Sequence, residues 1–471
     1  HTLIDFKINL VYTTDLDQLH ERVAKRWYDV CCQNAGLYIK IGQQVATMNH
    51  VLPAPYLKYF STLHDQAPAV SFATVDRIVR AEFNGSGPHD IFVNFEETPV
   101  AAASIAQVHR AELSDGTKVA VKVQKPEIAA QMPWDLLCFR FLVFGFEKIF
   151  DLPMYFCVDS ICEAVRQEAD FRVEAGNAVL ARRDLEHDQR FYVPAVHTAT
   201  STNKVLTMEW IDGIKISDLK ALTAAGFDTS HAAALMVDVF SHQIFVSGFV
   251  HADPHPGNIF IRRRPNSRDT QLVLLDHGSY LSESEDFRRE YCALWRAMVL
   301  LDTGAVEAIC RSWGIHDSHF FASMQLLKPF TPEKHSVHLQ ATTKEEVLQM
   351  HTEAYDRIKQ LLYDSQHVPP ELILLGRNMN IVRANNKGMG SPVNRINVMA
   401  RYAVAGLPLR HSTADGTGQE GGMTTVQRAE WYRDRIAHQP THAAVDLFGN
   451  WQVVPARRRA PEDACEVFGL R

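Results

Sequence analysis

The stretch Gly248-Phe249-Val250-His251-Ala252-Asp253-Pro254-His255-Pro256-Gly257-Asn258 places an aspartate and an asparagine five residues apart, after a histidine. The stretch is rich in turn residues and leads into an apolar strand. Phosphoryl transfer needs a carboxylate that takes the proton of the attacking hydroxyl and an oxygen ligand that holds Mg²⁺. This spacing supplies both groups from one loop, so it predicts Asp253 as the base and Asn258 as a metal ligand.

A second aspartate follows at a fitting distance. The apolar run at residues 271–275 ends in Asp276-His277-Gly278, eighteen residues beyond Asn258. This tripeptide has the position and form of the Mg²⁺-binding Asp-x-Gly that follows a kinase catalytic loop, so Asp276 is expected to be the second metal ligand. Either motif alone could consist of ordinary loop residues. Their order and spacing together favour phosphoryl transfer.

Composition describes an ordinary folded protein. The 471 residues, 46% hydrophobic and 22% charged, suffice for about two to four domains. A net charge of −7 and a pI near 6.3 give no global attraction to nucleic acid, and we expect no such partner. The eight cysteines lack CxxC pairs and zinc-type spacing, which predicts mostly reduced thiols.

No apolar run approaches the length of a membrane-spanning helix. The best candidate, Leu136 to Phe146, contains Arg140 and precedes Glu147 and Lys148, which predicts a buried or interfacial helix. Because the chain opens at His1, the lack of a targeting peptide or anchor in it says nothing about the native protein.

Residues 1–83 are predicted to form an all-helical N-terminal extension. Within it, Lys40 and Gln43 of Lys40-Ile41-Gly42-Gln43 share a helix face, and the glycine permits close approach of another backbone. Taken alone, a solvated lysine on a helix is the simpler interpretation of this motif.

Residues 84–212 are predicted to form a strand-rich lobe with inserted helices. Strand patterns follow a Gly-rich linker at residues 84–88 and cover residues 91–95, 105–113 and 117–124. Asp115-Gly116 should form the hairpin turn between the last two strands. Val119-Ala120-Val121-Lys122 has the form of the kinase strand whose lysine reaches the α- and β-phosphates, so Lys122 is a catalytic and nucleotide-binding candidate.

An alanine-rich segment lies in register with that lysine. Val108 stands fourteen residues before Lys122 and ends a GxGxxGxV pattern in which every glycine is replaced by alanine. The predicted nucleotide loop comprises Ala101, Ala103, Ser104, Ala106 and Val108. Because alanine disfavours positive φ, this loop should be stiffer than a glycine loop.

A helix carboxylate should pair with Lys122. The segment Asp159 to Arg182 is helical in pattern, and Glu174 is the predicted partner. Asp170 should lie one turn before it on the same face, and Glu168 and Asp170 are then free for another task. Without the neighbouring motifs, a generic acidic helix surface would be the simpler interpretation.

The remaining segments are assigned more coarsely. Asn203 to Trp210 predicts a strand that leads into a hinge, where backbone groups of Glu209 to Ile211 could meet the adenine. Residues 213–410 are predicted to form a helical lobe, and residues 411–471 a linker and polar tail. Helical patterning resumes from Glu283, which leaves no room for the usual peptide-binding segment. The polar segment Arg377 to Asn397 indicates a buried polar network or a substrate-facing surface.

These motifs resemble the UbiB/ADCK family of atypical kinase-like proteins over about residues 30 to 400. The resemblance rests on KxGQ, the alanine-rich loop, the strand lysine, the ExD motif Glu168-x-Asp170, Glu174, the catalytic loop and Asp276-His277-Gly278. It implies an α+β, two-lobed protein-kinase-like fold in which the KxGQ helix lies over the cleft and Lys40 is held by the ExD carboxylates. It also implies ATP/ADP and Mg²⁺ binding, ATPase or unorthodox kinase activity, a lipid or quinone-pathway substrate, and association with the mitochondrial inner membrane.

Two positions depart from the expected patterns. His277 stands where the family often has phenylalanine, which favours its lipid-homeostasis branch over the branch most directly tied to coenzyme Q. His255 stands two residues after the base, where protein kinases carry a lysine. An imidazole clamps a γ-phosphate less well than an ammonium ion does. We therefore expect an ATPase or a lipid or small-molecule kinase. The alternatives are a nucleotide-gated scaffold and a conventional protein kinase.

Overall fold

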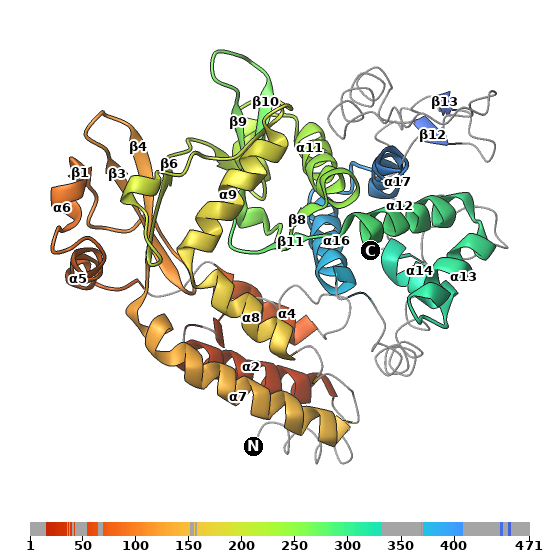
Figure 1. The fold of residues 1–471 in the computed structure, drawn as a ribbon, viewed down its shortest axis with the longest axis horizontal. Helices are drawn as coiled ribbons and strands as arrows, with labels where there is room; N and C mark the ends of the chain where they lie inside the picture. Colours follow the sequence, from red (N-terminus) through yellow and green to blue (C-terminus); the bar gives the residue numbers. More distant parts are fainter. Residues whose placement is uncertain are drawn as a thin grey trace, which may run out of the picture.

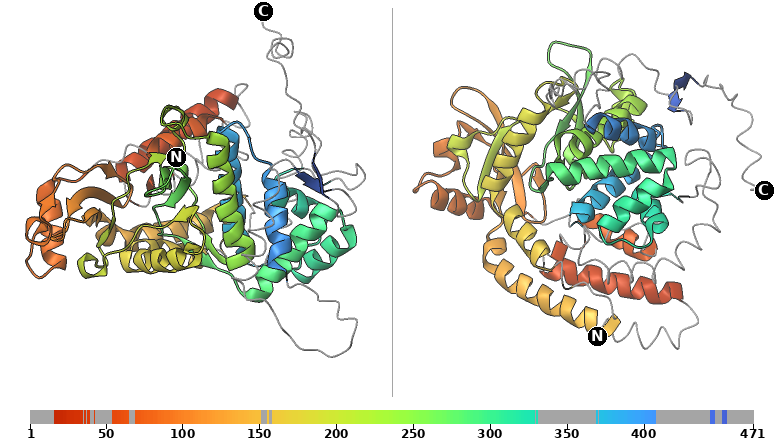
Figure 2. Two further views of the ribbon diagram at one scale, coloured as in Figure 1. Left: turned by 90° about the horizontal axis from the view of Figure 1, so that it is seen from above. Right: turned by 45° about the vertical axis from the view of Figure 1, so that its right-hand side comes forward.

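The structure is a computed structural model. It describes residues 16–34, 36, 38–39, 42, 54–64, 69–150, 155, 158–328, 330, 369, 371–407, 443–445 and 451–453. Lys40 and Gln43 lie outside these residues. In the predicted tail, the strands β12 (Ala443–Val445) and β13 (Trp451–Val453) pair with each other. Figures 1 and 2 show a strand-rich lobe and a mostly helical lobe, which confirms the predicted α+β class.

A five-stranded sheet forms the smaller lobe, in the order β1-β3-β4-β6 with β2 paired to β3. Its central strands bury alternate side chains against α5 (Phe72–Glu82), and Gly116, with a φ of 85°, makes the predicted hairpin turn. The strands are β1 (Asn94–Phe95), β2 (Ala101–Ala102), β3 (Ala106–Glu112), β4 (Lys118–Gln124) and β6 (Val205–Glu209).

The strand expected from residue 91 is mostly wrong. Pro88–Ile91 form the short helix α6, and only Asn94 and Phe95 pair with β3. Pro88 supplies a φ that suits a first helical turn, and the Asp90 side chain accepts the Gly87 N–H at 2.8 Å. Local helix-start signals therefore override the apolar pattern.

Two helices replace the single helical segment expected from Asp159 to Arg182. α8 (Val158–Glu168) ends before Asp170, whose side chain accepts the Arg172 N–H and caps α9 (Phe171–Leu185). A capping aspartate adopts an extended backbone, which breaks the helix. Asp170 is therefore not on a helix face with Glu174. α9 lies between the sheets of the two lobes (Figure 1).

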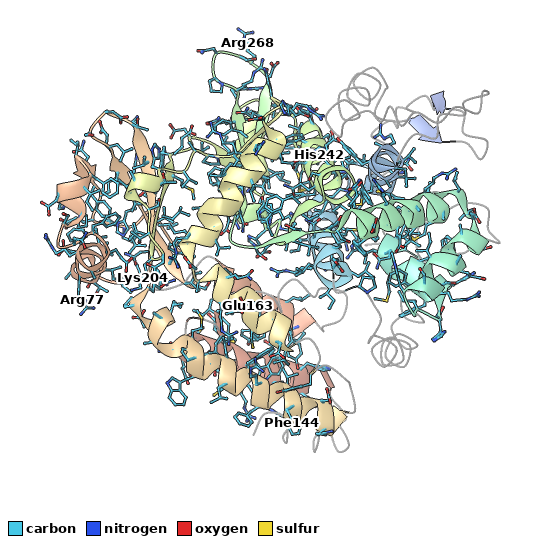
Figure 3. All side chains as sticks on the ribbon, viewed as in Figure 1. Arg77, Phe144, Glu163, Lys204, His242 and Arg268 are labelled. Carbon is cyan, nitrogen blue, oxygen red and sulfur yellow. The ribbon has the colours of Figure 1, made fainter. Side chains whose placement is uncertain are left out.

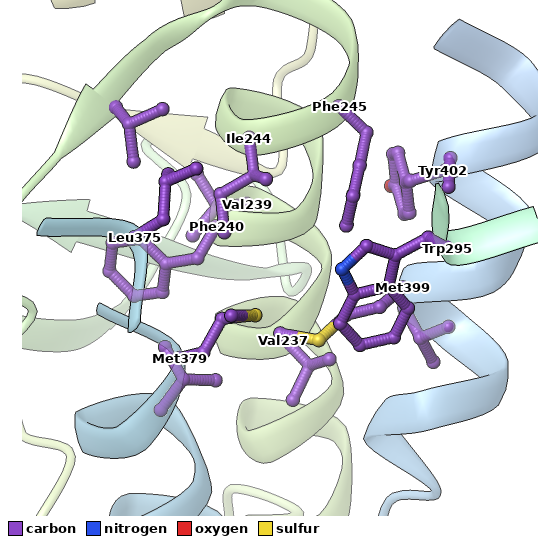
Figure 4. Packing of buried hydrophobic residues seen from close by; sticks show 14 of the residues in the cluster. Val237, Val239, Phe240, Ile244, Phe245, Trp295, Leu375, Met379, Met399 and Tyr402 are labelled. Atoms are coloured by element: carbon purple, nitrogen blue, oxygen red, sulfur yellow. The ribbon is translucent and has the colours of Figure 1, made fainter. Parts of the chain in front are cut away.

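The larger lobe is organised around α11 (Thr229–His242) and the π-turn η4 (Gln243–Ser247) that ends it. Figure 4 shows Val237, Phe240 and Phe245 packed among side chains of three further helices, including Trp295 and Met379. The helices of this lobe are α10 (Leu219–Ala224), α12 (Glu285–Leu300), α13 (Thr303–Ser312), α14 (Ser318–Leu326), α16 (Glu371–Gly388) and α17 (Arg395–Gly406).

The predicted catalytic loops of this lobe follow short strands. One sheet has the order β5-β10-β9-β7, and β8 pairs with β11 in a separate ribbon. The strands are β5 (Phe191–Tyr192), β7 (Ile214–Lys215), β8 (Phe249–His251), β9 (Ile259–Arg263), β10 (Thr270–Leu274) and β11 (Tyr280–Ser282). The loops that follow β8 and β10 hold the two sequence motifs.

α7 (Pro126–Phe150) corrects the expectation that no apolar run is long enough to cross a membrane. Its first 20 residues, Pro126–Gly145, suffice by length and composition. Arg140 lies within this stretch, and its guanidinium pairs with Asp159 of α8. Nor is the helix buried: five large apolar side chains are between 43% and 70% exposed, namely Trp134, Leu137, Phe141, Leu142 and Phe144. Figure 3 places Phe144 at the outer edge of the molecule.

Residues 16–64 supply the predicted N-terminal helices. α2 (Leu16–Asn34) and α4 (Ala54–Phe60) pack on each other through a small core, and α2 runs beside α7 in Figures 1 and 2. An added Cβ at Gly36 would lie 3.2 Å from Ile128 of α7. Gly36, four residues before Lys40 in the sequence, therefore lies close to the inserted helix of the smaller lobe.

Candidate active site

Lys122 of β4 and Glu174 of α9 form the expected ion pair. The lysine Nζ lies 2.8 Å from both carboxylate oxygens, and Asp276 Oδ2 lies 3.6 Å from the same Nζ. The Glu174 side chain is 2% exposed and that of Lys122 is 14% exposed. The Phe171 ring lies 5.2 Å from the ammonium. The strand, the helix and the Asp-His-Gly turn thus converge on one cation.

Burial and neighbouring charges together set the pKa values in this cluster. Burial by itself lowers the pKa of Lys122, but Asp276 and Glu174 outweigh burial and hold that pKa above its ordinary range. Burial raises the pKa of Glu174 to about 7, against the lowering effect of Lys122. We assign an ionised pair near neutral pH, because the ammonium contacts both oxygens of the carboxylate.

Asp276 is held by its own turn and by both lobes. Its Oδ1 accepts the Gly278 N–H at 2.9 Å, and its backbone carbonyl accepts the His251 Nε2–H at 2.8 Å. Asn177 donates to the His277 carbonyl at 2.9 Å. Because Asn177 lies on α9, the helix that positions the Lys122 partner also positions the turn. Sequence reasoning missed Asn177.

His277, between Asp276 and Gly278, is a neutral group. Its Nε2–H donates to the Leu274 carbonyl at 3.1 Å, and its Nδ1 accepts from the Tyr280 hydroxyl at 2.9 Å. Burial, and then the neighbouring His251, lower the pKa of His277 to about 3. No charge is therefore added beside the turn at neutral pH.

Two histidines order the catalytic loop. His251 accepts the Asp253 N–H at Nδ1 (3.0 Å), and burial lowers its pKa, so it serves as a neutral support. His255 Nδ1 accepts the Gly257 N–H at 3.1 Å and caps the turn that contains Asn258. One ring nitrogen of His255 is therefore directed at its own loop.

The two predicted metal ligands come from neighbouring strand ends. The Asn258 carbonyl accepts the Leu275 N–H at 3.0 Å, which places Asp276 directly after that contact. Within the described ranges, no group of three or more His, Cys, Asp or Glu residues could hold a metal. One carboxylate and one amide oxygen beside a nucleotide site are the donor set that Mg²⁺ takes together with phosphates. The residues present fit Mg²⁺.

Three side chains of α16 contact the catalytic loop. The Arg377 Nη2 lies 2.9 Å from Asp253 Oδ2. Asn378 and Asn385 donate to the carbonyls of two loop residues, at 2.6 and 3.1 Å. The polar segment is thus a network that is buried at Asn378 and supports the loop. Sequence reasoning noted its polarity but missed the contact of Arg377 with the base.

The ExD motif divides between two tasks. An added Cβ at Gly278 would lie 3.4 Å from the Glu168 Cγ, so Glu168 lies against the Asp276 turn. Glu168 also lines a pocket with Ile105 and residues of α7. Asp170, by contrast, caps α9 and pairs with Arg172 at 2.6 Å. The expectation that Asp170 is free for another task is not met.

The alanine-rich loop is a hairpin that contains no left-handed residue. β2 pairs with β3 in the register Ala101 with Val108, and the Ala103 N–H donates to the Ala106 carbonyl at 2.8 Å. Ala106 is fully buried, and Ser104 is 6% exposed. Lys125 holds the tip of this hairpin, because its buried ammonium donates to the Ala103 carbonyl at 2.6 Å. Sequence reasoning missed this lysine.

The predicted hinge has most of its donors in use. The Glu209 N–H donates to the Ala195 carbonyl at 2.8 Å, and the Trp210 N–H to the Lys118 carbonyl at 3.0 Å. The Glu209 carboxylate accepts from a tyrosine hydroxyl. Two of the three backbone N–H groups of residues 209–211 are therefore occupied by contacts within the chain.

Comparison with known proteins gives a consistent family. Residues 62–310 match the model of the ABC1 atypical kinase-like domain. A Schizosaccharomyces pombe protein described as an ABC1 family protein is 38% identical, over 85% of this chain and 76% of its own length. The AarF domain-containing protein kinase 1 of Mus musculus is 34% identical, over 81% of this chain and 73% of its own. A Dictyostelium discoideum protein named as a probable serine/threonine-protein kinase is 36% identical, over 84% and 57%.

Proposed function

Since the chain belongs to the ABC1 atypical kinase-like family, we propose that it binds ATP with Mg²⁺ between its lobes and transfers the γ-phosphoryl group to water or to a small molecule such as a lipid. The observation that carries this proposal is the convergence of Lys122, Glu174 and Asp276 beside a loop that holds Asp253 and Asn258. A nucleotide-binding scaffold would not require a base at that place.

Each residue has a definite task in this proposal. Lys122, held by Glu174, contacts the α- and β-phosphates. Asp276 and Asn258 hold Mg²⁺, which neutralises phosphate charge when bound. Asp253 accepts the proton of the attacking hydroxyl as the hydroxyl oxygen forms the new bond to the γ-phosphorus. The electron pair of the broken bond remains on the β-phosphate oxygen of ADP.

The acceptor is proposed to be small because little chain follows the Asp-His-Gly turn. β11 begins two residues after Gly278, and α12 begins at Glu285, capped by Ser284. A protein kinase places a long activation segment here as a platform for peptide substrates. The segment from Gly278 to Glu285 offers no length for such a platform.

Replacing Asp276 by asparagine tests the site. The change removes one charge from a place that must neutralise clustered phosphates, so we expect MgATP affinity to fall at least about tenfold, with little effect on binding of ATP in EDTA. Isothermal titration with and without Mg²⁺ measures both. Asp302→Asn, at the cap of α13 in the same lobe, is the matched control. An unchanged Mg²⁺-dependent affinity in folded Asp276→Asn would refute the assignment.

We further propose that the protein acts at the mitochondrial inner membrane, in lipid or coenzyme Q homeostasis, and that α7 contacts the bilayer. Family resemblance supports the compartment. The exposed apolar side chains of α7, which include Trp134 and Phe141, support the contact because an aromatic-rich helix face suits a membrane interface.

Exchanging Trp134 and Phe141 together for serine should weaken vesicle binding by about tenfold or more, because each ring buries a large apolar area in the interface. Co-sedimentation with phosphatidylcholine–phosphatidylglycerol vesicles measures the change. The control is Val93→Ser, which removes an apolar side chain of comparable exposure from the smaller lobe. Equal binding of the parent and the α7 variant would exclude this helix as the contact.

A further inference from the structure

The catalytic loop lacks the cation that protein kinases place beside the base. Where they carry a lysine two residues after the aspartate, this chain has His255, whose Nδ1 accepts the Gly257 N–H. The loop from Asp253 to Asn258 contains no lysine or arginine. Charge that develops on the transferred phosphoryl group needs a fixed positive partner near the base. The chain must supply that partner from elsewhere.

Arg377 of α16 lies beside the predicted base. Its Nη2 lies 2.9 Å from Asp253 Oδ2, and both side chains are about one quarter exposed, at 24% and 23%. The ion pair with Asp253 does not use all the N–H donors of the guanidinium. Among the described residues, the buried Nε and Nη2 have no hydrogen-bond acceptor, because the contact with Asp253 lacks the angle of a hydrogen bond. The guanidinium thus retains N–H donors that no described residue accepts, in a side chain that is partly exposed.

Two asparagines that follow Arg377 along α16 fix the register of this helix on the loop. The next residue, Asn378, is fully buried and donates to the His251 carbonyl at 2.6 Å. Two turns along α16, Asn385 donates to the Pro254 carbonyl at 3.1 Å. A charged group that is held before reaction stabilises a transition state without further reorganisation. The two asparagines thus give α16 a fixed register on the loop.

We propose that Arg377 is a catalytic residue that binds the γ-phosphoryl group during transfer and so replaces the missing lysine of the catalytic loop. The inference rests on the proposed function, because it assumes that phosphoryl transfer occurs at Asp253. A planar guanidinium suits this task, since it can contact a carboxylate and a phosphoryl oxygen at once. The residue comes from a helix remote in sequence, as an arginine finger does.

Binding of a phosphoryl mimic tests the proposal independently of turnover. In the parent chain, aluminium fluoride should tighten MgADP binding, because it imitates the group in transfer. Arg377→Gln should lose about 100-fold or more of that gain, while its affinity for MgADP alone stays close to the parent value. Arg377→Lys should recover only part of the gain. Added guanidinium ion should partly restore turnover in Arg377→Ala. Arg383→Gln, on the same helix, is the control and should keep the full gain.

The outcomes separate this inference from the proposed function. If Arg377→Gln, shown to be folded by its melting curve, gains as much affinity from aluminium fluoride as the parent, the inference is wrong and the function stands. Faster turnover in Arg377→Gln would make the ion pair an inhibitory latch and would also overturn it. If the parent binds MgADP but gains nothing from aluminium fluoride, or does not bind MgADP at all, the proposed function fails and the inference fails with it.

Discussion

Asp253→Asn is expected to abolish turnover and to leave MgATP affinity nearly unchanged. The base acts on the attacking hydroxyl and not on the resting phosphates, so its loss should lower the rate by at least about 10²-fold. The amide keeps the shape of the side chain but cannot take the proton. Steady-state ATP hydrolysis and titration with a non-hydrolysable ATP analogue measure the two properties separately.

One side effect must be controlled. Asp253 pairs with Arg377, and its neutralisation leaves a partly buried guanidinium without a counter-charge. Some loss of stability is therefore expected, and the melting temperature must show that the variant remains folded at assay temperature. Asp218→Asn, which changes a cap of α10 far along the chain, controls for loss of an aspartate in this lobe. Equal loss of binding and turnover in Asp253→Asn would show a structural aspartate.

The kinase-type motifs could be recognised in the sequence because the residues of each motif are close together in the chain. Asp253 and Asn258 belong to one loop, and Asp276 lies two residues after the end of β10. The contact of α16 with that loop could not be predicted, since Asn378 and His251 are 127 residues apart. Only the polarity of residues 377–397 indicated that this helix meets something other than an apolar core.

Two errors concern where a helical pattern begins. Asp170 was treated as one more helical carboxylate, although its side chain caps α9 and separates it from α8. The apolar run was taken to begin at Leu136, although α7 begins at Pro126. The cap of Asp170 is local in sequence, whereas the exposure of α7 depends on which elements pack against it.

Gly406→Ala is expected to destabilise the larger lobe severely, by about 3 kcal/mol or more. In an open helix position, alanine would stabilise by up to about 1 kcal/mol. Here the added Cβ would lie 1.9 Å from the Phe245 carbonyl oxygen and 2.8 Å from Cys292 Sγ. The two backbones cannot easily move apart, because the Arg288 Nη1 donates to the carbonyls of both Phe245 and Gly406, at 2.6 and 3.1 Å. Backbone on both sides of the contact is thus fixed by one buried guanidinium.

Gly376→Ala provides the matched comparison for this last change. Gly376 lies in α16 of the same lobe, and a Cβ there would meet no atom within 4 Å. Its melting temperature should therefore stay the same or rise, while that of Gly406→Ala should fall by many degrees in thermal unfolding followed by circular dichroism. If both variants melt together, α17 can move away from η4 at little cost. The junction of Phe245, Arg288 and Gly406 would then not be the rigid contact on which α12, α17 and the end of α11 are assembled.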